Sequence, residues 1–168
     1  KAIQLNPDFA GAHSNLGGIL CDLGKLKEAE ISTRKAIQLN PDFADAHLNL
    51  GNILTDLGNL KEAETYTRKA IQLNPDCAAG YWNLYGLANT IEEAEERINQ
   101  CLKVDENNLD AKLTLSALKL HQGDNSIFNN LAKSTYKDHP TARSIKWVST
   151  LPKLPELFFN RWALFDSM

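Results

Sequence analysis

The sequence repeats itself at an interval of 34 residues. The letters KAIQLNPDFA stand at residues 1–10 and again at residues 35–44, and residues 69–78 repeat them with Cys77 in place of Phe43. Pro7, Pro41 and Pro75 follow one another at the same spacing. A fixed period of roughly 20 to 50 residues predicts a solenoid, in which each unit buries its apolar face by stacking on the next unit.

Each unit has the pattern of two antiparallel helices. Apolar or small residues recur at helical spacing in two runs, the first holding Leu16, Gly17, Leu20 and Leu23 and the second Leu26, Ala29, Thr33, Ala36 and Ile37. Gly24 suits the turn between them, because glycine tolerates the left-handed conformation that commonly ends a helix. Pro41 ends the second helix, because proline cannot continue the hydrogen-bond ladder. The small residues Gly17, Ala29 and Ala36 allow the two helices of the repeat to approach each other closely.

The period divides the chain into four repeats. We expect them at residues 10–43, 44–77, 78–108 and 109–142, after the end of a truncated repeat at residues 1–9 and before capping or junction helices at residues 143–168. The third repeat is three residues shorter, which predicts a tighter turn between its helices, and Glu106 replaces its terminating proline. The predicted fold is all-α, a right-handed superhelix of nine or ten helices with no sheet.

Composition and charge narrow the classes of function. The chain is 43% hydrophobic and 23% charged, with a formal net charge of −3. Basic residues alternate with Glu along the repeats, which disfavours nucleic-acid binding. No apolar run reaches the roughly 18 residues of a membrane helix. Cys21, Cys77 and Cys101 lack the spacing of a disulfide or metal framework, so we expect reduced packing residues in a cytoplasmic protein.

The two best repeats resemble the tetratricopeptide repeat (TPR) family. The resemblance rests on seven positions, which are Leu16, Gly17, Leu20, Gly24, Ala29, Ala36 and Pro41 in the first repeat and Leu50, Gly51, Leu54, Gly58, Ala63, Ala70 and Pro75 in the second. Two positions depart from the family pattern: His13 and His47 stand where a bulky aromatic residue is frequent, and so do Thr33 and Thr67. We interpret the histidines as packing residues, because no carboxylate or cysteine completes a metal site.

The repeat geometry places a candidate binding site on the first helices. Stacked hairpins curve so that their first helices line a concave groove. The candidate peptide-binding residues are Ser14, Asn15 and Asp22; Leu48, Asn49, Asn52 and Asp56; Trp82 and Asn83; and Leu113. Asn15, Asn49 and Asn83 form a ladder with one amide per repeat, which can pair with a peptide backbone and resembles the asparagine ladder of the O-GlcNAc transferase family. Alternatively, these amides only bridge neighbouring helices.

No catalytic constellation is found in the sequence. There is no nucleophile with a base and an orienting group, no glycine-rich phosphate loop and no HExxH motif. The carboxylate pairs Glu92–Glu93 and Glu95–Glu96 are expected on a solvated helix face. We therefore predict a protein that is not an enzyme and has neither a cofactor nor a metal.

The chain ends suggest a second class of function. The segment LPKLPELFFNRWALFD is similar to a junction in cyanobacterial proteins, where such repeats precede a macrocin O-methyltransferase-like domain. That resemblance implies a docking or oligomerisation arm of a larger enzyme, such as a methyltransferase or glycosyltransferase. Ala2, Ile3 and Leu5 lack a partner helix, which predicts self-association through exposed repeat ends. The other class of function is a scaffold that binds a protein or peptide in its groove, and it does not depend on these ends.

Overall fold

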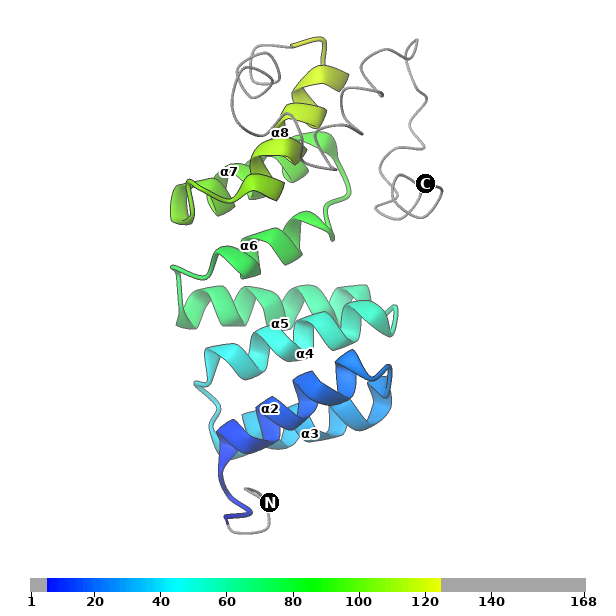
Figure 1. The fold of residues 1–168 in the computed structure, drawn as a ribbon, viewed down its shortest axis with the longest axis vertical. Helices are drawn as coiled ribbons and strands as arrows, with labels where there is room; N and C mark the ends of the chain where they lie inside the picture. The colour runs from blue at the N-terminus through cyan, green and yellow to red at the C-terminus, as the bar shows by residue number, and fades with distance from the viewer. Residues whose placement is uncertain (1–5, 125–168) are drawn as a thin grey trace. The chain divides into compact units, whose positions relative to one another are not determined.

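The computed structural model describes residues 6–124 as a series of helices (Figure 1). Within that range there are seven α-helices and no strand: α2 Ala10–Asp22, α3 Leu26–Leu39, α4 Ala44–Asp56, α5 Leu60–Leu73, α6 Ala78–Tyr85, α7 Ile91–Val104 and α8 Leu109–His121. The predicted all-α repeat fold is confirmed. The second helix of the fourth repeat, the C-terminal segment 143–168 and the N-terminal residues Ala2, Ile3 and Leu5 lie outside the described residues.

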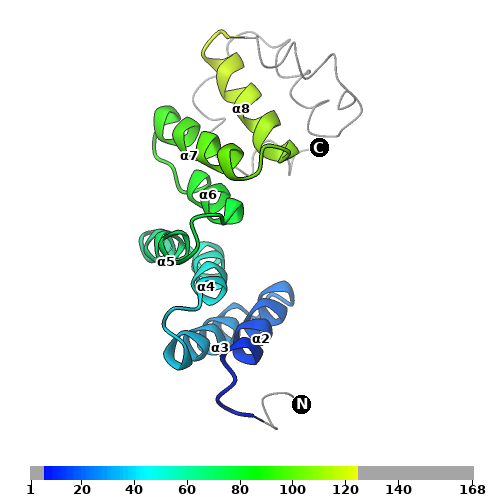
Figure 2. The ribbon, with the colours of Figure 1, turned by 90° about the vertical axis from the view of Figure 1, so that its left-hand side faces the viewer.

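The chain divides into two compact units, residues 1–87 and residues 88–168. The first unit contains α2 to α6, and the described part of the second contains α7 and α8. Within the first unit, α2 contacts α4 and α4 contacts α6. These three helices follow one another on one side, while α3 and α5 lie on the other side (Figure 2). The first helices of successive repeats thus form a continuous row.

The turns between the helices are formed by glycine, asparagine and aspartate residues that recur from repeat to repeat. Gly24, Gly58 and Gly123 adopt positive φ angles of 72°, 79° and 85° after the first helices. After the second helices, the side-chain oxygen of Asn40 accepts a hydrogen bond from the Asp42 amide at 3.2 Å. Asp105 does the same for the amide two residues later, at 3.1 Å. The third repeat therefore keeps this turn without a proline, because an Asp side chain can make the same bond as Asn.

The two helices of a repeat approach most closely at a glycine. A side chain at Gly17 would come 3.3 Å from the Ala29 carbonyl oxygen and well inside contact distance of the Thr33 hydroxyl. Thr33 is fully buried, and its hydroxyl donates to that same carbonyl at 2.9 Å. The second repeat has the same arrangement at Gly51 and Thr67. Threonine therefore fills, with a bonded hydroxyl, the space that glycine leaves.

We predict that Gly17→Ala destabilises the chain by about 1 to 3 kcal/mol, because the new methyl group overpacks the contact with Thr33. Gly18 is the matched control, since it lies on the same helix and an added methyl group there meets nothing within 4 Å. Gly18→Ala should be neutral or stabilising by up to about 1 kcal/mol through helix propensity. Urea unfolding measures both, and equal effects of the two substitutions would contradict the close-contact account.

The third repeat differs from its expected form. Its first helix, α6, has 8 residues, whereas α2 and α4 have 13 each. The connection to α7 runs over residues 86–90, compared with residues 23–25 in the first repeat. The expected tighter turn was wrong: the missing residues shorten the helix, and the connection becomes longer. Thr90 fixes this outcome, because its hydroxyl caps α7 by accepting from the Glu93 amide at 3.2 Å.

Neighbouring repeats of the first unit are joined on the outer side by Arg34. Its guanidinium donates to Glu30 of its own helix at 2.8 Å and to Glu62 of α5 at 2.7 Å. It also donates to the Tyr66 hydroxyl at 3.0 Å and lies over that ring. The hydrogen bonds to the two carboxylates raise the pKa of Arg34 above its ordinary value. Arg34 therefore forms a bonded link between the first and second repeats.

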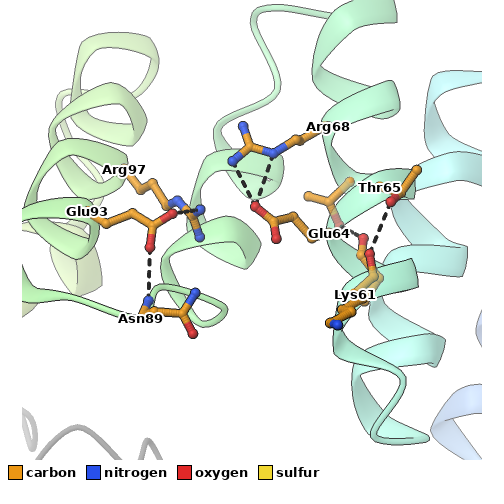
Figure 3. A network of polar contacts seen from close by, with 9 residues as sticks. Lys61, Glu64, Thr65, Arg68, Asn89, Glu93 and Arg97 are labelled. Atoms are coloured by element: carbon orange, nitrogen blue, oxygen red, sulfur yellow. Dashed lines mark hydrogen bonds and ion pairs between the residues drawn. The ribbon is translucent and has the colours of Figure 1, made fainter.

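Polar contacts also line the exposed side of α5 and the start of α7 (Figure 3). On α5, Arg68 pairs with Glu64 one turn earlier, and the Thr65 hydroxyl donates to the Lys61 carbonyl at 3.0 Å. In the second unit, the Glu93 carboxylate accepts from the Asn89 amide at 2.9 Å and pairs with Arg97. Each set of contacts holds one helix in place within its own unit.

Glu95 links α7 and α8, the two helices in the described part of the second unit. Its carboxylate pairs with Lys119 of α8 and accepts from the Gln122 side chain at 3.2 Å. The hydrogen bond from Lys119 lowers the pKa of Glu95, against a smaller opposing effect of burial. A carboxyl group whose pKa is lowered in the folded state stabilises the fold above its unfolded pKa, and this contribution is lost as the pH falls through the folded pKa.

We therefore predict that Glu95→Gln lowers the stability of the chain at neutral pH. The difference from wild type should shrink as the pH falls below the ordinary glutamate pKa of about 4.3 and disappear below the lowered pKa of Glu95. Thermal unfolding at a series of pH values measures this. Glu96→Gln is the control, because Glu96 is exposed and its bond is to the neutral Gln100. A pH-independent effect of Glu95→Gln would show that the ion pair with Lys119 does not contribute.

Candidate functional site

The predicted peptide-binding residues of the first unit lie along the row formed by α2, α4 and α6. Three contacts join neighbouring first helices. The Asn49 amide donates to the Ser14 hydroxyl at 3.1 Å, the Asn83 amide donates to the Asn52 side-chain oxygen, and the Cys21 thiol donates to Asp56 at 3.6 Å. The structure thus brings residues of successive repeats together. We call Asn15, Asn49, Asn52 and Asn83 the amide surface.

The ladder does not run directly from one asparagine to the next. Asn49 bonds to Ser14 and not to Asn15, and Asn83 bonds to Asn52 and not to Asn49. The amides therefore bridge neighbouring helices, which was the alternative interpretation of the pattern. An asparagine side chain can make about four hydrogen bonds, and among the described residues each of these two makes one. The bridging role therefore leaves capacity for a ligand.

Several of the candidate residues differ in exposure. Asn15, Asn52, Asp22 and Asp56 are exposed, whereas Asn49, Asn83, Leu48 and Trp82 are half-buried. Ser14 is buried and acts by holding Asn49. Leu113, on α8, is only 2% exposed and belongs to the core of the second unit. A ligand could not contact Leu113, so Leu113 is not a binding residue of this structure.

An aromatic pair stands beside the amide surface. Trp82 and Tyr85 of α6 pack with ring centroids 5.3 Å apart, and both rings are half-buried. Tyr85 was not among the expected site residues. Its spacing of three from Trp82 could have indicated it, because residues three apart lie on the same face of a helix. The two rings are tilted against each other by 41° and form an aromatic pair on the same helix as Asn83.

The thiols of Cys21 and Cys101 are poor nucleophiles. Burial raises the pKa of the Cys21 thiol, and Asp56 raises it further. Burial also raises the pKa of the Cys101 thiol, with a smaller contribution from Asp105. Both thiols are therefore protonated at neutral pH, whereas thiolates are the reactive form.

The two histidines of the repeats each bond to the backbone. Nε2 of His13 bonds to the Pro7 carbonyl at 2.8 Å, and Nε2 of His47 bonds to the Pro41 carbonyl at 2.7 Å. The His47 ring also stacks on Tyr66, with centroids 5.8 Å apart. These contacts support the interpretation of both histidines as packing residues. No group of three or more potential metal ligands is present in the part of the chain that the structure describes.

The paired carboxylates of α7 have structural partners. Glu93 and Glu95 were expected on a solvated face, but Glu93 binds Asn89 and Arg97, and Glu95 binds Lys119 and Gln122. These two carboxylates therefore secure helix ends and helix pairs.

None of the helices within residues 6–124 is long and apolar enough to span a membrane.

Family models match the first two repeats. Residues 44–77 match the model described as tetratricopeptide repeat, and residues 17–58 match the model described as TPR repeat. The segment 17–77 therefore carries tetratricopeptide repeats, as the spacing of its small and apolar residues predicted. No curated protein matches the chain.

Solved structures share the fold. The first TPR of Spaghetti (RPAP3) bound to the HSP90 peptide SRMEEVD is 20% identical over 69% of this chain and 94% of that chain, with a TM-score of 0.64. YrrB, a TPR protein with an unusual peptide-binding site, is 19% identical over 98% and 86%, with a TM-score of 0.70. The Arabidopsis OM64 TPR domain is 21% identical over 67% and 95%, with a TM-score of 0.61. At such identities the likeness concerns the fold.

Proposed function

We propose that this chain is a protein-interaction scaffold that binds an extended segment of a partner along the amide surface. The observation that carries the proposal is the unused hydrogen-bonding capacity of Asn49 and Asn83, which stand in successive repeats on adjacent first helices. Amide side chains can bond to a peptide backbone without requiring a particular side chain. Two structures of the same fold are described by their peptide or peptide-binding site, and this supports the same use here.

The amide role has a specific test in the double substitution Asn49→Ala and Asn83→Ala. Peptides selected from a random dodecapeptide display library on the wild-type chain serve as the probe. We predict a roughly ten- to hundredfold loss of affinity, because two hydrogen bonds to the same peptide are removed. The unfolding free energy should fall by about 1 to 3 kcal/mol, because the bonds to Ser14 and Asn52 are lost as well.

Ser14→Ala separates the binding role from the bridging role. This substitution removes the partner of Asn49 and leaves the amide itself in place. It should lower stability by about 0.5 to 1.5 kcal/mol and leave peptide affinity almost unchanged. If the double variant loses stability and binds peptides as well as wild type, the amides only bridge helices, and the proposal is wrong.

A second candidate function is docking through an apolar face of α2, as expected for an arm of a larger enzyme or assembly. Repeat-equivalent residues differ sharply in exposure: Leu16 is 37% exposed and Leu50 0%, and Ile19 is 57% exposed and Ile53 1%. Stacking of α3 and α4 buries the second pair. The first pair forms an apolar face, and such faces are typical of interaction sites. We propose that this face mediates self-association.

For this second candidate, we predict that Ile19→Lys makes the chain monomeric at concentrations where the wild type associates, because a charge cannot be buried without a partner. Sedimentation velocity measures the change. Ile31→Lys is the matched control, since Ile31 is also exposed but its equivalent in the next repeat, Thr65, is exposed too. A monomeric wild type, or equal effects of the two substitutions, would argue against docking through this face.

A further inference from the structure

The charges of the first unit are segregated between its two sets of helices. Every Lys and Arg between residues 10 and 87 lies on α3 or α5, except Lys25, which directly precedes α3. The row formed by α2, α4 and α6 therefore contains no Lys or Arg. Its Asp residues are Asp22, Asp45 and Asp56, all of them exposed. Apart from the two histidines, every ionisable carboxylate or cationic side chain of these three helices is thus acidic.

These carboxylates lack cationic partners. Within the part of the chain that the structure describes, Asp22 and Asp45 accept no side-chain hydrogen bond and form no ion pair, and Asp56 accepts only the Cys21 thiol at 3.6 Å. By contrast, Glu30, Glu62 and Glu64 on the second helices pair with Arg34 or Arg68. The acidic charge of α2 and α4 is therefore uncompensated, while that of α3 and α5 is largely balanced.

The ends of the helices reinforce this charge. Asp22 and Asp56 are the last residues of α2 and α4, and neither helix has a basic residue in its last turn. The C-terminal end of a helix carries a partial negative charge, so a carboxylate there is unfavourable and a cation favourable. The Cys21 thiol at the end of α2 donates to the Asp56 carboxylate at the end of α4, so these two helix ends lie side by side. A positive ligand group there would be favoured by the partial negative charge of both helix ends.

The aromatic pair of α6 is suited to the same kind of ligand. Trp82 and Tyr85 present half-exposed rings on a helix without any charged residue. Lys and Arg side chains bind to the faces of such rings, and Trp provides the strongest interaction of this type. Asn83, next to Trp82 in the sequence, bonds to Asn52 of α4. The rings and Asn83 therefore belong to the same helix of the row.

We propose that the segment bound by this scaffold is basic: an extended peptide whose main chain bonds to Asn49 and Asn83 while its Lys or Arg side chains meet Asp22, Asp56 and the rings of α6. The proposal rests on the proposed peptide-binding function and adds the chemical class of the partner. Opposite charges steer association and exclude partners of the wrong sign. An acidic segment would meet three carboxylates and no basic residue along the row of first helices.

The test uses the dodecapeptide library on the full chain, followed by matched synthetic peptides. The enriched sequences should contain an excess of Lys and Arg over the input library. In the best peptide, replacing the basic residues with Gln should weaken binding about tenfold, and replacing them with Glu should abolish it. Affinity for the basic peptide should also fall as the salt concentration rises, because salt screens exposed charges.

Substitutions in the chain complete the test. The double variant Asp22→Asn and Asp56→Asn should bind the basic peptide about tenfold more weakly and the Gln peptide as well as wild type does. Asp42→Asn with Asp76→Asn is the matched control, because it makes the same change in net charge at exposed loop positions between repeats. That control should bind both peptides as wild type does.

The possible failures are distinguishable. If no library peptide binds, both this inference and the proposed peptide-binding function are wrong. If peptides bind but are neutral or acidic, or if the Gln peptide binds as well as the basic peptide, the amide surface has a ligand of another class and only this inference is overturned. Equal loss of affinity in the two Asp→Asn double variants would show a general effect of net charge and would overturn it too.

Discussion

The close contact between the two helices of a repeat sets the geometry on which the candidate site depends. At Gly17 and Gly51 the backbones approach so closely that a single methyl group would collide with the threonine of the facing helix. Thr33 and Thr67 fill the remaining space, and each hydroxyl donates a hydrogen bond to a carbonyl of its own helix. Because α4 packs against both α3 and α5, the spacing of each hairpin also fixes the distance between α2 and α4. The Asn49–Ser14 bond requires that distance.

Successive repeats of the first unit are linked in chemically different ways on the two sides. On the side of the second helices, Arg34 joins Glu62 and Tyr66 through charge-assisted and cation–π contacts. On the side of the first helices, neutral amides and a thiol make the links. A charge that is already paired has little left to offer a ligand, whereas a bridging amide keeps most of its bonding capacity. This difference favours the first-helix row as the recognition surface.

Much of this arrangement could be predicted from the repeat period, which placed the hairpins, the glycine turns and the small residues at the contact. The features that could not be predicted depend on helix capping, side-chain pairing and burial, which the alignment of one repeat with the next does not determine. The gap in the third repeat fell in the helix because the Thr90 cap fixes where α7 begins. Asn83 pairs with Asn52 because side chains of packed helices meet according to crossing geometry and not according to equal repeat position. Leu113 aligned with the residues expected in the groove, yet it is buried. The reason is that α8 packs against α7, whereas the first helices α2 and α4 pack against each other as well as against α3 or α5.

The distribution of partners among the polar groups favours recognition over chemistry for the described residues. Burial raises the pKa of the Cys21 and Cys101 thiols, and the ring nitrogens Nε2 of His13 and His47 bond to backbone carbonyls. Glu93 secures the start of α7, and Glu95 joins α7 to α8. Groups with structural partners of this kind are poorly placed to transfer protons. Among the side chains of the first-helix row, the amides of Asn49 and Asn83 and the carboxylates of Asp22 and Asp45 keep open bonding capacity. Those are the groups that a surface needs in order to bind the backbone and the positive side chains of a partner.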